Sequence, residues 1–439
     1  MKNFPHIGVQ IPTTYLPVKE IDLTKWAVIA CDQFTSQPEY WENVTHLVGD
    51  SPSTLHLILP EVYLGNPEED QLTQTTKEKM QQYLSDGLLS PQERIIYVER
   101  SVASKTRRGL MLALDLEKYD FSVGSQSLIR ATEGTILNRL PPRMRIRKEA
   151  PLELPHILVL IDDPEDRVIG TIEAQKTDLP VAYDFDLMQN SGHLCGRLVD
   201  DDALEESVIH NLEVLASPDV FYPKYKIGKD KGVLLFAVGD GNHSLATAKS
   251  IWEELKTTVG MDHPARYALV EVENIHDQGL KFEPIHRVLF DIKRDLKQSL
   301  YDHFGSDLTL EPMDNAADLK ASVKEGVPGT HVFGLIANRG LTLGKINNPI
   351  ANLAVGSLQP VLDRVLKEGE ASLIDYVHGD DAVFSLGSQP GNTGIYLPGM
   401  SKNELFRTVL LDGALPRKTF SMGEAHEKRF YMEARKIIT

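Results

Sequence analysis

The hydrophobic and polar residues between positions 232 and 255 change from a strand pattern to a helix pattern. Residues 232–238 are almost continuously apolar, which predicts a buried strand. The next three residues, Gly239, Asp240 and Gly241, have the composition of a tight turn. From Asn242 to Leu255, apolar residues recur three or four positions apart, which is typical of a helix with one buried face. This segment therefore predicts a strand, a glycine turn and a helix in succession.

Strand and helix patterns also alternate along the rest of the chain. The runs that predict strands are residues 26–30, 55–59, 94–99, 109–116, 154–161, 267–272, 331–337 and 341–346. The runs that predict helices are residues 76–88, 202–216, 291–304, 316–324, 356–367 and 402–412. The mixture predicts an α/β (α+β) fold with mixed sheets.

The chain is longer than a usual domain. It has 439 residues, whereas a domain usually has roughly 100–200, so we expect two or three domains. Without a repeat or a low-complexity linker to mark the boundaries, we place them where the character of the chain changes, near residues 125 and 280. The expected division is an N-terminal α/β domain at 1–125, a central core at 126–280 and a C-terminal α/β domain at 281–439.

The charge balance argues against binding to polyanions. The chain has 46 basic and 63 acidic residues, which gives a net charge of −17 with neutral histidines. Such a surface repels phosphate backbones and anionic lipids at long range. We therefore expect no nucleic acid and no membrane among the partners.

Cysteine content and hydropathy predict a cytoplasmic protein. Only Cys31 and Cys195 are present, they are far apart, and the first 30 residues lack the pattern of a secretory signal. No apolar run reaches the about 18 residues that a membrane-spanning helix requires. The composition leaves the oligomeric state open.

The glycine turn is the first candidate for chemistry. The N-terminus of a helix presents free N–H groups and a positive dipole end, and glycines allow a phosphate to approach the backbone. Gly239, Asp240 and Gly241, with Asn242 and Ser244, are therefore candidates for nucleotide or phosphate binding. The alternative is a purely structural turn in which Asp240 or Asn242 caps the helix. The turn is not a Walker loop, and it lacks the third glycine of the dinucleotide motif.

Three further features lie near this turn or precede it in the chain. His243, in the first turn of the helix, is a candidate for donating to a phosphoryl oxygen and, with Asp240, for placing a metal-bound nucleotide, although a capping or solvent-facing role is the alternative. Glu133, within a run of small residues, is a candidate general base. The basic residues between 139 and 148 are Arg139, Arg143, Arg145, Arg147 and Lys148. Arginines of such a run can bind an anionic substrate or phosphate in a bidentate manner, but a run of charged residues is more often a solvent-exposed face.

The histidine and cysteine residues predict no structural metal. His193 and Cys195 form too small a set for a zinc site, and neither a Cys-x-x-Cys nor a His-Glu-x-x-His motif accompanies them.

Several short segments carry a resemblance to a known family. They are Ala30-Cys31-Asp32-Gln33-Phe34, the run from Leu55 to Glu61, Arg107-Arg108-Gly109, the turn at Asp240-Gly241, Pro284-Ile285-His286-Arg287, Asp375-Tyr376-Val377-His378 and Pro416-Arg417-Lys418-Thr419. With these segments the chain resembles, from end to end, a large bacterial and archaeal family of unknown function that is grouped in the ParB and sulfiredoxin-like superfamily. The resemblance implies that the central region, 126–280, is a ParB-like nucleotide-binding core.

Within that superfamily the free serine kinases are the most informative comparison. The resemblance implies that Glu133 is the base for the substrate hydroxyl, that Asp240 and Gly241 begin the phosphate-binding turn, and that His243 is its second histidine. This chain departs from the kinase motifs at four positions: Thr132 and Asn242 each replace a histidine, and Gly134 and Ser244 each replace an arginine. Arg143 and Arg147 align approximately with family arginines, and with Mg²⁺ at Asp240 they would compensate the phosphate charge.

These observations lead to three hypotheses. The first is a nucleotide-dependent kinase that uses Mg²⁺ with ATP or ADP and phosphorylates a small hydroxylated metabolite, with free L-serine as the leading substrate. The second is a catalytically inactive nucleotide-binding sensor or regulatory protein, because the turn has lost two positive groups. The third, a nucleotide-dependent DNA clamp, is disfavoured by the negative charge and by the lack of an evident helix-turn-helix. His286, Arg287, His378 and Lys418, with Asp32, are further residues that the other domains could bring to the pocket.

Overall fold

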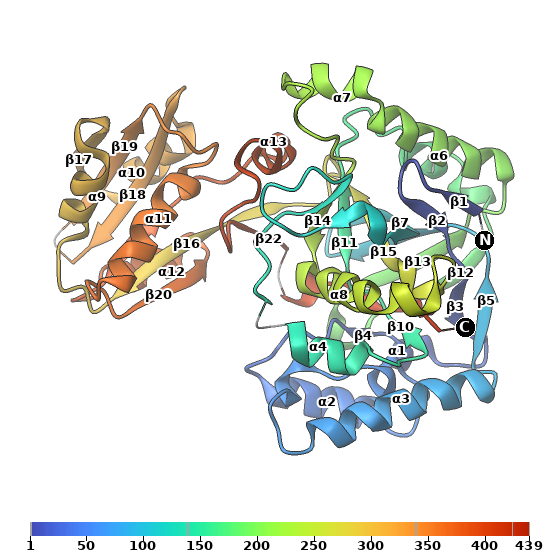
Figure 1. The fold of residues 1–439 in the computed structure, drawn as a ribbon. Coiled ribbons are helices and arrows are strands. Elements are labelled where there is room, and N and C mark those ends of the chain that lie inside the picture. The colour runs from blue at the N-terminus through green and yellow to red at the C-terminus, as the bar shows by residue number, and fades with distance from the viewer. Residues whose placement is uncertain (1, 138–139, 339, 424, 439) are drawn as a thin grey trace. The chain divides into compact units, whose positions relative to one another are not determined.

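The computed structural model describes residues 2–137, 140–338, 340–423 and 425–438, and the chain forms two compact units (Figure 1). Unit 1 contains residues 1–280 together with 424–439, and unit 2 contains residues 281–423. The expected boundary near residue 125 is not a division between units, because strands from both sides of it share one sheet. The last residues of the chain also belong to unit 1 rather than to a C-terminal domain.

The main sheet of unit 1 has eleven strands. Nine of them lie in the order β12, β13, β6, β7, β15, β11, β14, β9, β8, and β2 pairs with both β1 and β7. Strands β11 and β15 are parallel, as are β14 and β9, whereas β6, β7 and β15 are antiparallel neighbours. This mixed sheet confirms the expected fold class. The strands are β1 Lys2–Phe4, β2 Val9–Ile11, β6 Ile96–Val102, β7 Lys105–Asp115, β8 Tyr119–Asp120, β9 Ile129–Ala131, β11 Leu158–Ile161, β12 Val181–Asp186, β13 His193–Leu198, β14 Phe236–Asp240 and β15 Tyr267–Asn274.

Both faces of this sheet are covered. Leu110, Leu112 and Leu114 of β7 pack into one hydrophobic cluster, whereas Met111 between them packs into the other. This is the two-residue period of a strand that is buried on both sides. In Figure 1, α2 and α3 lie together at one end of the unit and α6 and α7 at the other. The helices are α1 Leu23–Trp26, α2 Pro38–Val48, α3 Glu69–Ser85, α4 Leu140–Arg147, α5 Gly170–Glu173, α6 Asp202–Ala216, α7 Pro218–Tyr225 and α8 Asn242–Val259.

The end of the chain completes unit 1. Strand β23 (Phe430–Tyr431) pairs with β4 (Val28–Ile29), and β24 (Arg435–Lys436) pairs with β10 (Leu152–Glu153). Strands β3 (Thr14–Pro17) and β5 (Leu89–Gln92) form a further pair. Tyr431 and Met432 are buried in the same cluster as Trp26 and Trp41. Residues about 400 positions apart in sequence therefore share one core.

Unit 2 is built on an antiparallel sheet in the order β17, β19, β18, β21, β16, β20, with β22 paired to β16. Val288, Ile336 and Val383 are among its buried core residues. Its strands are β16 Phe282–Phe290, β17 Leu308–Met313, β18 Thr330–Ala337, β19 Gly340–Asn347, β20 Leu373–His378, β21 Thr393–Tyr396 and β22 Phe420–Met422, and its helices are α9 Leu296–Phe304, α10 Ala316–Glu325, α11 Ala354–Lys367, α12 Asp380–Gly387 and α13 Lys402–Asp412.

The strand expected at residues 55–59 is wrong. The chain there forms a 3₁₀ turn, Thr54–Leu57, in which the Ser53 hydroxyl accepts a hydrogen bond from the N–H of Leu55 at 3.2 Å. The run is apolar and largely buried, but this local side-chain bond favours a turn over a strand. Within the described part of the chain, no helix combines the length and apolar character needed to cross a bilayer.

Candidate functional site

Strand β14 leads into α8 through Gly241, in the order that the sequence pattern predicts, although Gly239 and Asp240 still belong to the strand. Gly241 has φ of 76° and ψ of 25°, a left-handed conformation that favours glycine. A Cβ at this position would lie 3.0 Å from the Cα of Ile157, so the turn also packs tightly against the chain leading into β11. Gly241 is the N-cap residue of α8 and has no side chain to cap the helix, and Asp240 accepts a hydrogen bond from the N–H of Gly241 at 3.0 Å. Asp240 and Asn242 therefore do not occupy the N-cap position that the structural alternative assigns to one of them, and a purely structural turn stays an alternative to phosphate binding.

The segment that carries Glu133 lies against the same turn. The N–H of Thr132 donates to Oδ1 of Asn242 at 3.3 Å, and the Thr132 hydroxyl donates to the carbonyl of Val238 at 2.6 Å. Farther along, the N–H of Ile136 donates to Nε2 of His243 at 3.3 Å. Glu133, between these two anchors, is half-buried. The structure thus brings the backbone of residues 132–136 to the first turn of α8, where Asn242 and His243 hold it.

Asp240 is engaged by a cation from the end of the chain. Nζ of Lys428 lies 2.9 Å from Oδ2 of Asp240. Burial acts to raise the pKa of the Asp240 carboxyl, but Lys428, together with His156 and the Gly241 N–H, outweighs it and leaves the pKa below its usual value. Both carboxylate oxygens therefore already have partners, and one partner is a cation. This arrangement does not fit the expected metal role of Asp240, and the described residues contain no cluster of histidine, cysteine and acidic side chains that could hold a metal ion.

The candidate arginines lie on α4, which packs against α8. Arg143 pairs with Glu61, and Arg147 pairs with Glu153. Arg145 is exposed, as expected for a solvated face, and pairs with Glu69. Arg143 and Arg147 are largely covered and do not belong to a solvated face. Arg139 lies outside the described residues.

Arg143, Arg147 and Ser244 line one cavity of about 130 Å³. The cavity also contains groups that the sequence analysis missed. Oγ of Ser244 is 2.8 Å from Nε2 of His156, and Nδ1 of His156 is 2.8 Å from the Tyr431 hydroxyl, which also accepts from the N–H of Cys31. Burial raises the pKa of Tyr431 well above its usual value, so this hydroxyl keeps its proton.

No sequence signal marks these missed residues. His156 is a single histidine at the start of a buried strand pattern, and Tyr431 and Lys428 lie almost 200 residues beyond the turn. Only the fold of the terminal segment brings Tyr431 and Lys428 to this region.

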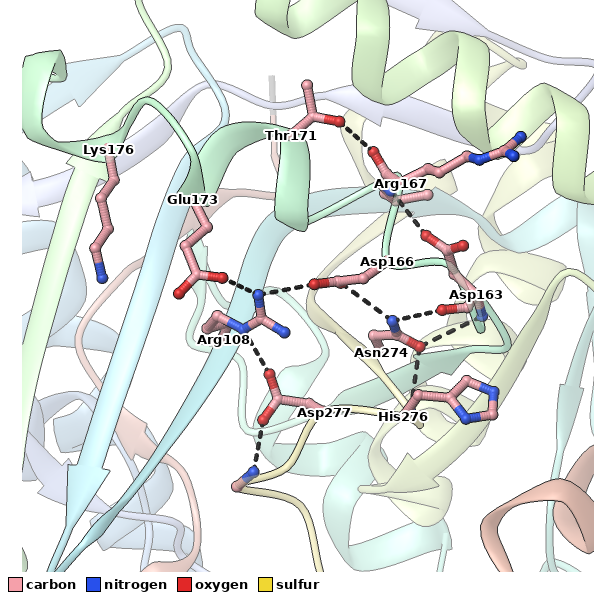
Figure 2. A network of polar contacts seen from close by, with 12 residues as sticks. Arg108, Asp163, Asp166, Arg167, Thr171, Glu173, Lys176, Asn274, His276 and Asp277 are labelled. Carbon is pink, nitrogen blue, oxygen red and sulfur yellow. Dashed lines mark hydrogen bonds and ion pairs between the residues drawn. The ribbon is translucent and has the colours of Figure 1, made fainter.

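The Arg107-Arg108-Gly109 segment has a structural explanation. Arg108 contacts three carboxylates, those of Asp166, Glu173 and Asp277, and so connects the loops that follow β11 and β15 (Figure 2). Nε of Arg107 is 3.5 Å from the buried Glu273. At Gly109, a Cβ would lie within 3.0 Å of the Glu271 side chain, so only glycine fits without displacing it. These interactions account for the three residues without invoking a ligand.

Three other segments of the resemblance meet within unit 2. Arg287 of β16 is fully buried and donates to the carbonyl of Arg417 at 3.0 Å. Nε of Arg417 donates to the Tyr376 hydroxyl at 2.7 Å, and both guanidinium groups lie over the Tyr376 ring. His286, also on β16, accepts from the N–H of Leu397 at 3.1 Å. Arg287, Tyr376 and Arg417 are therefore joined by structural contacts of this unit, and a role for His286, Arg287, His378, Lys418 or Asp32 in a pocket stays a prediction.

A family model matches residues 15–365, which is most of the chain. The chain belongs to the family described as "Protein of unknown function (DUF1015)". This membership agrees with the resemblance to a family of unknown function, whereas the ParB and sulfiredoxin-like grouping stays a prediction. No curated protein matches the chain in sequence.

Solved structures show distant similarity to this DUF1015 chain. A conserved hypothetical protein from Pyrococcus furiosus matches with 10% identity and a TM-score of 0.37, covering 77% of this chain and 98% of that one. A free serine kinase in complex with AMP matches with 10% identity and a TM-score of 0.38, covering 75% and 91%. C-terminally truncated SbnI from Staphylococcus aureus matches with 11% identity and a TM-score of 0.33, covering 75% and 83%. No part of the site described above depends on these matches.

Proposed function

We propose that this protein is a nucleotide-dependent phosphotransferase that phosphorylates a small hydroxylated metabolite, with L-serine as the first substrate to test. The observation that carries the proposal is the N-terminus of α8. Its N-cap residue is the left-handed Gly241, which has no side chain to cap the helix, and its first turn holds residues 132–136 through Asn242 and His243. The free N–H groups and the dipole of an 18-residue helix favour an anion such as a nucleotide phosphate.

The proposed acid–base chemistry rests on Glu133. In the first step, nucleotide phosphate oxygens accept hydrogen bonds from the N–H groups at the start of α8. Glu133 then accepts the proton of the substrate hydroxyl as its oxygen attacks the terminal phosphorus, and the bond to the leaving phosphate breaks. Lys428 neutralises the negative charge of Asp240 through their ion pair, which lessens the repulsion of a phosphate at the turn. The assignment of Glu133 is supported by the sequence resemblance and by the position of its segment at the turn.

A nucleotide-binding sensor without catalysis is the second candidate, and a specific observation favours it. The two arginines that would compensate the charge of a transferring phosphoryl group are paired with Glu61 and Glu153. Each of those pairs would have to open before its arginine could stabilise a transition state. Binding without turnover would then be the function of the turn.

The test is phosphorus NMR of the purified protein with Mg²⁺, L-serine, and ATP, ADP or CTP in turn. The proposal predicts phosphoserine with the wild type and a loss of at least about 10²-fold in rate with Glu133→Gln, which removes the base. Glu206→Gln is the matched control, because it makes the same charge change at an exposed position of α6.

The outcomes separate the two candidates. Phosphorylation that proceeds at the wild-type rate in Glu133→Gln contradicts the assigned base. Saturable nucleotide binding by calorimetry with every nucleotide left intact contradicts the phosphotransferase and favours the sensor. A panel of other hydroxylated metabolites, tested under the same conditions, separates a wrong acceptor from a lack of activity.

A further inference from the structure

The cavity beside α8 has a mainly aliphatic wall. It is partly open to solvent and is lined by residues from the 3₁₀ turn at 54–57 and the segment after it, from α3, from α4, from the chain between β10 and β11, and from the first turns of α8. Such a wall favours the apolar part of a ligand, because burial of apolar surface is the main source of binding free energy. The aliphatic residues include Leu57, Met80, Ile146, Leu152, Leu154 and Leu269.

The size of the cavity limits its ligand. Its volume is about 130 Å³. An engineered apolar protein cavity of about 150 Å³ binds benzene. A ligand that fills this cavity therefore has on the order of six or seven non-hydrogen atoms by that comparison. A whole nucleotide would extend out of the cavity, which is partly open to solvent.

The charges in the wall cancel. Arg143 pairs with Glu61 and Arg147 with Glu153, so two guanidinium groups face two carboxylates. Glu153 is held further by the N–H of Leu269 at 2.8 Å and by Nε of Arg435 at 2.6 Å. A charged ligand would lose its hydration and find each opposite charge already paired, which is costly in a buried site. An uncharged ligand avoids this cost.

One polar group in the wall can recognise a hydroxyl. A serine hydroxyl has one donor and two acceptor positions. Among the described residues, the Ser244 hydroxyl forms a hydrogen bond with Nε2 of His156 at 2.8 Å. His156 is in turn fixed by Tyr431, so this end of the cavity is rigid and leaves hydrogen-bonding capacity on Ser244.

We infer that this cavity is a binding site for a small uncharged molecule with an apolar body and one hydroxyl group, of the size of phenol. The apolar body lies against the aliphatic wall, and the hydroxyl hydrogen bonds to Ser244. The inference does not depend on the proposed phosphotransferase activity, since it concerns binding without a nucleotide.

Ligand-observed NMR titrations of the full-length protein test this site, with phenol, benzene and L-serine as probes and no nucleotide present. We expect saturable binding of phenol and benzene, and none of L-serine. Ser244→Ala should weaken phenol about fivefold, the equivalent of one ordinary hydrogen bond of about 1 kcal/mol, and leave benzene unchanged.

A second pair of variants locates the site. Ile146→Phe on α4 places a larger side chain in the half-buried wall and should abolish binding of both phenol and benzene. Met144→Phe on the same helix is the matched control, because Met144 does not line the cavity, and it should leave both affinities unchanged. Urea unfolding of each variant, followed by tryptophan fluorescence, verifies that it is folded.

Several results would overturn the inference. They are an absence of saturable phenol binding to the wild type, an unchanged affinity in a folded Ile146→Phe variant, an equal loss of phenol and benzene binding in Ser244→Ala, and displacement of phenol by L-serine. A failure of phosphoryl transfer leaves these titrations unaffected, so the two proposals are tested separately.

Discussion

Replacing Gly241 with alanine should destabilise unit 1 through two separate effects. The first is backbone strain, since a non-glycine residue in the left-handed region costs about 1–2 kcal/mol. The second is a clash, because the new Cβ would lie 3.0 Å from the Cα of Ile157, a backbone atom that cannot rotate away. Overpacking of this kind costs about 1–3 kcal/mol. The sum is a loss of about 2–5 kcal/mol for Gly241→Ala.

Gly87→Ala is the matched control for this prediction. Gly87 also has a positive φ, of 67°, but a Cβ there would meet no atom within 4 Å. It should therefore lose only the cost of backbone strain, about 1 kcal/mol. Both glycines belong to unit 1, so the difference between the two variants measures the close approach of the turn to Ile157.

The assay is urea unfolding followed by tryptophan fluorescence. All three tryptophans of the chain, Trp26, Trp41 and Trp252, are buried in unit 1, so the signal reports on that unit. With a slope of about 3 kcal/mol/M, a loss of about 3 kcal/mol lowers the midpoint by about 1 M, against about 0.3 M for Gly87→Ala. Equal midpoints for the two variants would refute the reasoning, since they would show that the contact with Ile157 adds nothing to the strain.

Two further predictions concern buried charges of unit 1. Burial, against the opposing effect of Arg107, raises the pKa of Glu273 to about 7 from an ordinary 4.5. The native state therefore binds this proton more tightly than the unfolded chain, and stability falls as the pH rises through that window. Glu273→Gln should reduce this loss of stability by about 1.4 kcal/mol for each unit of pKa shift. If the urea midpoint changed between pH 5 and pH 8 by the same amount in the variant and in the wild type, the assignment would be contradicted. Arg429→Met should cost about 3–5 kcal/mol in urea unfolding, because it leaves the buried carboxylates of Glu271 and Glu433 without their cation, and a cost below about 1 kcal/mol would contradict that role.

The elements with a strong local pattern could be predicted from the sequence. The helices expected at 202–216 and 402–412 match α6 and α13, and the strands expected at 94–99 and 109–116 are the antiparallel neighbours β6 and β7. These segments have either a clear helical period or an alternation of residues, and both survive in the fold because local preference and burial agree. The expected strand at 26–30 was predicted less well. It contains the end of α1 and the short strand β4, although the whole run is buried.

The candidate site could be predicted only in part, because its charges are paired over long distances in sequence. The helix begins at Asn242 as expected, whereas the strand before it is Phe236–Asp240 rather than 232–238, so that Gly239 and Asp240 end the strand and Gly241 makes the turn. The partner of Asp240 is 188 positions away, and that of Arg143 is 82 positions away. Electrostatic pairing of this kind is set by the fold and leaves no periodic pattern in the sequence. The basic run therefore could not be assigned from its composition to a ligand or to structural ion pairs.

The division of unit 1 between two separate stretches of the chain has a consequence for how the protein is made. Residues 281–423 form one continuous stretch, so unit 2 has all of its strands and helices as soon as that stretch leaves the ribosome. Unit 1 must wait for residues 424–439, which supply β23, β24 and the buried Arg429 and Glu433. Domains usually fold in the order of synthesis. Here unit 1 is completed after unit 2: until residues 424–439 emerge, the nascent chain carries an incomplete unit 1 in which the apolar partners of Tyr431 are exposed to chaperones.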